Sequence, residues 1–116
     1  MQDLTQKPYQ THNDRHISIS GTHLLARLSN LSYHRIVEMF GEPADEYDDY
    51  KSDAEWMILF PDGEVATIYN YKNGRNYCGP DAPAKEDITL WNVGGQHSDV
   101  VLRLHQILMK EPIHYA

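Results

Sequence analysis

The chain has 116 residues, 41% of them hydrophobic and 10% aromatic, so it can build one modest core but not two domains. This composition argues against a disordered chain, and no apolar run reaches the roughly 20 residues of a membrane-spanning helix. The formal net charge is −7, and residues 42–55 carry most of it, with seven acidic residues against one lysine. A polar start without the apolar core of a secretory signal, together with a lone cysteine, predicts a cytoplasmic protein.

The first 15 residues are polar and lack periodicity, which predicts a flexible N-terminal arm ahead of a single domain over residues 16–116. Residues 16–20 alternate in polarity, and Gly21 can form a bulge before the chain continues extended to Leu28. We therefore expect a first strand between residues 16 and 28.

A short helix is predicted directly after this strand. Ser32 is a typical N-cap, and apolar side chains follow at the spacing of one helical face, at Tyr33, Ile36, Val37 and Phe40. Gly41 is expected to end the helix in the left-handed conformation, and Pro43 prevents the helix from resuming.

Residues 54–71, AEWMILFPDGEVATIYNY, have the pattern of a β-hairpin. Two runs rich in β-branched and aromatic residues flank Pro61, Asp62 and Gly63, which are residue types that short turns require. The first run is apolar on both faces, since Met57 and Leu59 alternate with other apolar side chains. Such a strand needs cover on each side, so a homodimer joined through the sheet is one expectation.

A long loop over residues 72–86 follows the hairpin. Residues 88–93 are predicted to form the next strand, which stops at Gly94 and Gly95, and Ser98 is expected to cap a final helix. The order β-α-β-β-β-α predicts an α+β fold with a four-stranded, mainly antiparallel sheet and two helices on one face.

Two groups of residues are candidates for binding. In the first, acidic charge would steer a basic partner and tyrosines would anchor it: Asp45, Glu46, Tyr47, Asp48, Asp49 and Tyr50. In the second, backbone amides at a glycine turn and nearby aromatic rings suit a phosphate and a base: Tyr69, Tyr71, Arg75, Trp91, Gly94, Gly95, His97 and Ser98. The plain structural alternatives are a solvated loop and a tight strand-to-helix turn.

No catalytic residue, metal site or cofactor is predicted. His97, Ser98 and Asp99 are contiguous, so they cannot form a catalytic relay. The acidic residues lack the glycine and terminal glutamate of a hand-type calcium loop. Cys78 has Arg75 nearby but no paired base, which indicates an unreactive thiol.

Several short runs stand in a fixed order along residues 31–108: Phe40-Gly41-Glu42-Pro43, Asp53-Ala54-Glu55-Trp56, Phe60 with Asp62-Gly63, Val65-Ala66-Thr67-Ile68-Tyr69, Lys72 with Gly74, Tyr77 with Gly79, and Trp91 with Gly94-Gly95. Together they resemble a group of small accessory proteins of tailed phages, with Asn92 in place of a histidine and Cys78 in place of an aliphatic residue. The resemblance brings no activity with it. It implies a setting in which small proteins act as inhibitors or sponges against host defence or metabolism.

Three functions are therefore expected. The first is a small non-enzymatic, phage-type binding protein, of an anti-CRISPR or anti-signalling kind, which inhibits a host defence or nucleic-acid-handling protein through its acidic, tyrosine-containing segment. The second is a sponge that sequesters a nucleotide-type signal at the Gly-Gly turn, and the third is a small hydrolase with His97 as general base. The acidic charge disfavours direct nucleic-acid binding, and no membrane partner is expected.

Overall fold

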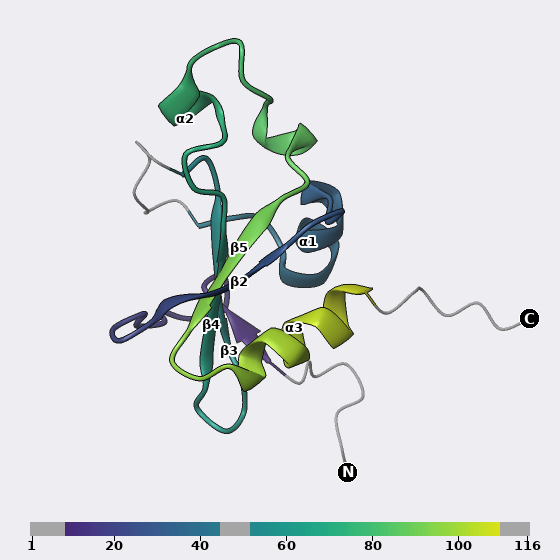
Figure 1. Ribbon diagram of the computed structural model, residues 1–116. Helices are drawn as coiled ribbons and strands as arrows, with labels where there is room; N and C mark the ends of the chain where they lie inside the picture. The colour runs from purple at the N-terminus through teal and green to yellow at the C-terminus, as the bar shows by residue number, and fades with distance from the viewer. Residues whose placement is uncertain (1–8, 45–51, 110–116) are drawn as a thin grey trace, which may run out of the picture.

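The computed structural model describes residues 9–44 and 52–109, and it shows an α+β fold built on a five-stranded antiparallel sheet (Figure 1). The strands are β1 (Gln10–Thr11), β2 (His23–Leu28), β3 (Glu55–Leu59), β4 (Val65–Tyr69) and β5 (Trp91–Gly95). The helices are α1 (Tyr33–Phe40), α2 (Arg75–Cys78) and α3 (Asp99–Met109), with a 3₁₀ turn at Lys85–Asp87. Over these two ranges, no helix combines the length and the hydropathy that crossing a membrane would require.

The strand order in the sheet is β1-β3-β4-β5-β2, and every neighbouring pair is antiparallel. The expected hairpin is confirmed as β3 and β4, with Trp56 opposite Ile68 and a φ of 91° at Gly63 in the turn. The prediction of four strands is wrong by one. β1 has only two residues, which is too short to leave a periodic pattern in the sequence.

Residues 9–15, which the sequence assigned to a flexible arm, pack on the domain instead. Gln10 pairs with Leu59, and Thr11 pairs with Ile58. Tyr9 is 7% exposed and belongs to the core, where its hydroxyl donates a hydrogen bond to the Met39 carbonyl at 2.8 Å. The domain therefore begins at least seven residues earlier than predicted, and residues 1–8 lie outside the described ranges.

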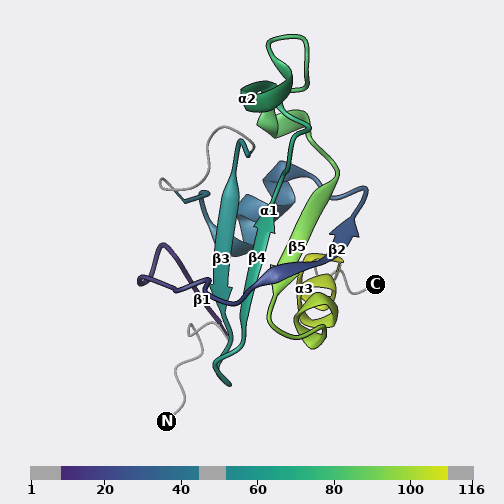
Figure 2. The ribbon, with the colours of Figure 1, turned by 60° about the vertical axis from the view of Figure 1, so that its left-hand side comes forward.

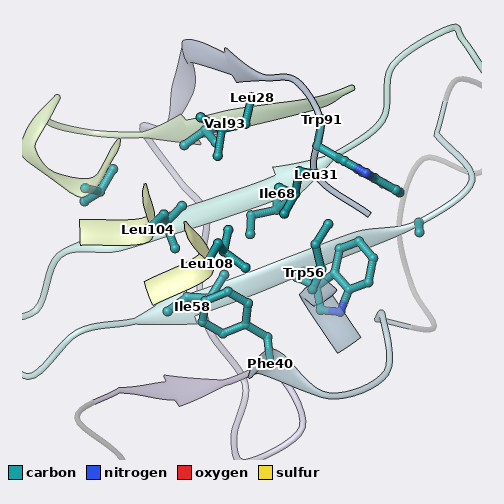
Figure 3. Packing of buried hydrophobic residues seen from close by; sticks show 14 of the residues in the cluster. Leu28, Leu31, Phe40, Trp56, Ile58, Ile68, Trp91, Val93, Leu104 and Leu108 are labelled. Atoms are coloured by element: carbon teal, nitrogen blue, oxygen red, sulfur yellow. The ribbon is translucent and has the colours of Figure 1, made fainter. Parts of the chain in front are cut away.

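Helices α1 and α3 lie on the same face of the sheet (Figure 2). Both contribute to one cluster of buried side chains, and in Figure 3 Leu104 and Leu108 of α3 lie over Ile58 and Ile68 of the sheet. Trp56 and Trp91 are fully buried on this face, with ring centroids 5.4 Å apart in an edge-to-face arrangement. The core therefore occupies the layer between the sheet and these two helices.

The sequence signals for α1 are confirmed at both ends. The Ser32 side chain accepts a hydrogen bond from the Arg35 amide at 3.0 Å, as an N-cap should. At the other end Gly41 takes a φ of 85°, and its amide bonds to the Val37 carbonyl at 2.8 Å. Its ψ of −169° lies outside the left-handed helical region. The prediction for Gly41 is therefore correct for the positive φ and wrong for the left-handed conformation.

The sheet face opposite α1 and α3, which we call the open face, receives partial cover from the same chain. The segment between β1 and β2 crosses this face in both ribbon views (Figures 1 and 2). Residues 16–20 form no strand there, because they run over the sheet instead of along its edge, and Ile17 is 4% exposed. Met57 and Leu59 on the second face of β3 are consequently half-buried within one chain. A homodimer stays a prediction.

Candidate functional site

A cavity of about 210 Å³ opens on the open face, and we call it the tyrosine pocket. Strands β2, β3, β4 and β5, together with the segment that crosses them, supply its walls, which consist of Ile19, Thr22, His23, Ser52, Glu55, Thr67, Tyr69, Tyr71 and Gly94. None of these described lining residues is lysine or arginine. The pocket is therefore polar, aromatic and acidic in character.

Tyr69 and Tyr71 form one side of the pocket. They share a face because side chains alternate along β4 and its continuation, as the sequence predicted. Their rings stand at 90° to each other with centroids 6.5 Å apart. Burial raises the pKa of Tyr69, and the negative charge of Glu55, its register partner on β3, raises that pKa further.

Gly94 forms the floor of the pocket and lies inside β5. A Cβ atom at this position would lie 2.5 Å from the Thr67 hydroxyl oxygen and 3.2 Å from the His23 carbonyl oxygen. Only glycine therefore lets β5 pass this close to Thr67 while leaving the space above it open. Thr67 itself is 3% exposed and borders the cavity.

The predicted glycine turn is wrong, because Gly94 and Gly95 both pair in the middle of the sheet. Gly94 lies opposite Thr67 and Leu24, while Gly95 lies opposite Ala66 and His23. Gly95 faces the helices, where an added Cβ would meet a Val100 methyl group at 2.7 Å. The two glycines permit close packing on opposite faces and do not form a phosphate-binding turn.

The other residues of the predicted ligand site lie elsewhere. Trp91 points into the core, where its indole N–H donates to the Ile88 carbonyl, so it cannot stack beside Tyr69. Arg75 belongs to α2 and donates to the Ala82 carbonyl at 2.9 Å. His97 and Ser98 are exposed after β5, and His97 Nδ1 lies 3.4 Å from a Glu64 carboxylate oxygen. Of the eight predicted residues, the pocket unites Tyr69, Tyr71 and Gly94.

A buried polar network that the sequence analysis did not identify holds one wall of the pocket. Asn70 is fully buried, and its side-chain oxygen accepts the amides of Asp53 and Ala54 at 2.7 and 3.0 Å. Its side-chain nitrogen donates to the Asp53 carboxylate at 2.9 Å and to Asn73 at 3.0 Å. A signal was present, because Asn70 occupies a core-facing position in the alternation of β4.

The same network ties down the loop after β4. The Asn76 amide donates to the Asp53 carboxylate at 3.3 Å, and the Asn76 side chain donates to the Ser52 carbonyl at 3.1 Å. Position 74 requires glycine, because a Cβ atom there would lie 2.1 Å from an Asp53 carboxylate oxygen. Asp53, one of the seven acidic residues counted from the sequence, is therefore a buried structural group rather than part of a solvated charged surface.

Beside the pocket, the chain places a cation of its own against aromatic rings. The Lys72 ammonium lies 5.2 Å from the ring centroids of both Tyr71 and Tyr77. Lys72 has a φ of 61°, a conformation that a residue with a side chain seldom adopts. The ring of Tyr71 is thus already part of one cation–π contact.

The acidic binding group predicted from the sequence, Asp45 to Tyr50, lies outside the described residues. The chain returns to the described structure at Ser52, which lines the tyrosine pocket. The acidic segment, residues 42–55, therefore ends at the pocket wall. In the described ranges no three His, Cys, Asp or Glu residues cluster closely enough to hold a metal ion.

A second hollow, an apolar groove of about 660 Å³, lies between α3, the end of α1 and the tip of the hairpin. Arg103 crosses it, forming an ion pair with Asp62 and lying 5.0 Å from the Phe60 ring centroid. The hydrogen bond from Arg103 holds the pKa of the Asp62 carboxyl at about 2. Tyr9, the first described residue, lines this groove.

No protein-family model matches this chain, and no curated protein sequence is significantly similar to it.

Proposed function

We propose that this chain is a non-enzymatic binding protein that receives a basic surface of a partner protein on the open face of its sheet. The observation that supports this most is the tyrosine pocket, an acidic and aromatic cavity whose described lining contains no basic side chain of the Lys or Arg type. Tyrosines are frequent anchors in protein interfaces, because they bury a large rigid ring and still offer a hydroxyl group.

The charge distribution supports a basic partner. Residues 42–55 carry seven acidic residues and one lysine, while the rest of the chain is nearly balanced. Ser52 and Glu55, at the end of this segment, line the pocket, so one carboxylate of the segment belongs to the pocket wall. A local excess of negative charge raises the association rate of a positively charged partner and selects against other partners.

The alternative of a nucleotide sponge has less support from the pocket. Cavities that enclose drug-sized ligands measure about 300–1,000 Å³. The tyrosine pocket, at about 210 Å³, is smaller and presents Glu55 where a phosphate would need a cation. The hydrolase alternative rests on His97, which is well exposed and lies outside the pocket lining.

The resemblance to accessory proteins of tailed phages extends the proposal to the setting in which the protein acts. In that setting the partner is a host protein, and occupation of its basic surface inhibits it. A basic groove that handles nucleic acid is one such surface, and an acidic protein competes there with the phosphate backbone.

The proposal is tested by measuring association with a lysine-rich peptide at several salt concentrations. Replacing Asp48 and Asp49 by lysine should lower the association rate at low salt by at least tenfold and flatten its salt dependence. The control reverses Asp81 and Glu86, two exposed acidic residues of the loop before β5 that do not line the pocket. Equal effects of both reversals, or none from either, would refute a basic partner at the open face.

A further inference from the structure

We propose that the tyrosine pocket binds an alkylammonium group, which a lysine side chain of the partner would supply. This inference rests on the proposed function and specifies the chemical group that the open face recognises. Its basis is the combination of two perpendicular aromatic rings, a carboxylate and a glycine floor in one small cavity.

The aromatic walls are suited to a cation. The face of a tyrosine ring attracts an ammonium group within about 6 Å of its centroid, and two rings at right angles offer a corner that contacts the cation from two sides. Tyr69 and Tyr71 stand edge to face at an interplanar angle of 90°, with ring centroids 6.5 Å apart, and both line the pocket. The Lys72 ammonium lies 5.2 Å from the Tyr71 centroid, so this ring already makes one cation–π contact within the chain.

A counter-charge is built into the same wall. Glu55 lies directly opposite Tyr69 in the register of β3 and β4, and both line the pocket. Burial raises the pKa of the Tyr69 phenol, and the negative charge of the nearby Glu55 carboxylate raises that pKa further. Arg27 acts on Tyr69 in the opposite direction and more weakly, and it is not part of the pocket lining.

The floor adds space and a hydrogen-bond acceptor. Gly94 leaves room that a Cβ would fill, and the Thr67 hydroxyl borders this room. Thr67 is 3% exposed, and it is one of the residues that line the cavity. The Thr67 hydroxyl oxygen can accept a hydrogen bond from an ammonium N–H that enters between the tyrosines.

The size of the cavity selects a head group rather than a whole metabolite. About 210 Å³ is below the range of cavities that enclose drug-sized ligands. An alkylammonium at the end of a flexible chain fits this size, since only its head needs to enter. A lysine side chain has that form, and so does a small free ammonium compound such as choline.

The test titrates the full chain with three small probes and follows backbone amide signals by NMR. The probes are N-acetyl-lysine amide, choline, and a neutral tert-butyl analogue that matches the shape of a trimethylammonium group. Saturable shifts at Thr67, Tyr69 and Gly94 are expected with at least one cationic probe, with at least tenfold weaker binding of the neutral analogue. Stronger binding of the lysine probe identifies a protein partner, and stronger binding of choline identifies a free ligand.

Two variants and a matched control place the binding in the pocket. Tyr71→Ala and Glu55→Gln should each weaken the better cationic probe by about five- to thirty-fold, as expected for loss of a cation–π contact or a counter-charge. Tyr77→Ala, which removes a tyrosine of nearly equal exposure that does not line the pocket, should change the affinity less than twofold. Equal binding of the neutral analogue, or equal losses in all three variants, would overturn the inference.

The outcomes separate this inference from the proposed function. If neither cationic probe binds while the lysine-rich peptide still depends on Asp48 and Asp49, the pocket chemistry is wrong and the basic partner stands. If the cationic probes bind but replacing Asp48 and Asp49 does not change association of the peptide, the pocket is a site for a small ammonium ligand and the proposed function is wrong.

Discussion

At the scale of single residues, the buried side chain of Asn70 holds together the two segments that flank the pocket wall. Its side chain joins the start of β3 to the loop after β4 through four hydrogen bonds, and it has no exposed surface. Buried polar groups are costly when one partner is lost, since the remaining donors and acceptors keep their desolvation penalty. Residues 53 and 54, which Asn70 holds, lie in the chain between the pocket-lining Ser52 and Glu55.

We predict that Asn70→Ala lowers the free energy of unfolding by roughly 2–4 kcal/mol, because it leaves two buried amides without their acceptor and removes one donor to the Asp53 carboxylate. Urea unfolding of both proteins measures the difference. Asn70→Asp restores the acceptor for the two amides but places a second carboxylate against Asp53. A proton on either carboxyl relieves this repulsion, so the deficit of Asn70→Asp should shrink as the pH falls from 7 to 4.5. A loss below about 0.5 kcal/mol for Asn70→Ala would show that the network is dispensable.

Some residues of the pocket could be predicted from the sequence and others could not, and the physical reason differs between them. Alternation along β4 correctly put Tyr69 and Tyr71 on one face, since side-chain direction in a strand follows from sequence spacing alone. Gly94 belongs to the site for a different reason than expected, since close packing between strands and a tight turn both favour glycine. Trp91 was misplaced because the side of the sheet it faces depends on register, which its own sequence does not encode.

At the scale of elements, the strongly patterned ones were predictable and the short or irregular ones were not. The β3–β4 hairpin, α1 and α3 each have a regular apolar period together with turn or capping residues. β1 is a two-residue edge strand, and residues 16–20 alternate in polarity although they run across the sheet without pairing. Such segments adopt their structure through tertiary contacts, so local sequence does not specify them.

The status of β1 is testable at Tyr9, the residue that enters the core beside it. Its ring packs edge-on against Phe40 with centroids 5.1 Å apart, and its hydroxyl bonds to the Met39 carbonyl. Tyr9→Ala should lower the free energy of unfolding by about 3 kcal/mol or more, and Tyr9→Phe by about 1 kcal/mol. Thermal and urea unfolding measure both, with Tyr77→Ala as a control at an exposed tyrosine. If all three variants unfold like the parent, residues 9–15 behave as the flexible arm that the sequence indicated.

At the scale of the whole molecule, the two faces of the sheet are covered differently. One face is sealed by α1 and α3 over the aromatic core. The other receives one crossing segment and keeps the tyrosine pocket, at the point where the acidic segment rejoins the described structure. The core thus lies beneath one face, while the other face is the one to which the proposed function assigns the partner.

The most direct test of this account is to map the surface that a lysine-rich peptide contacts, using backbone amide shifts of the full chain. The account predicts that the largest shifts cluster on the open face, at residues 19–23, 52–55, 67–71 and 94. Residues of α3 such as Leu104 should remain unperturbed, because they are buried beneath the other face. Shifts concentrated around the apolar groove at Met39 and Ile107, or no saturable shifts at all, would contradict the assignment of the open face as the binding surface.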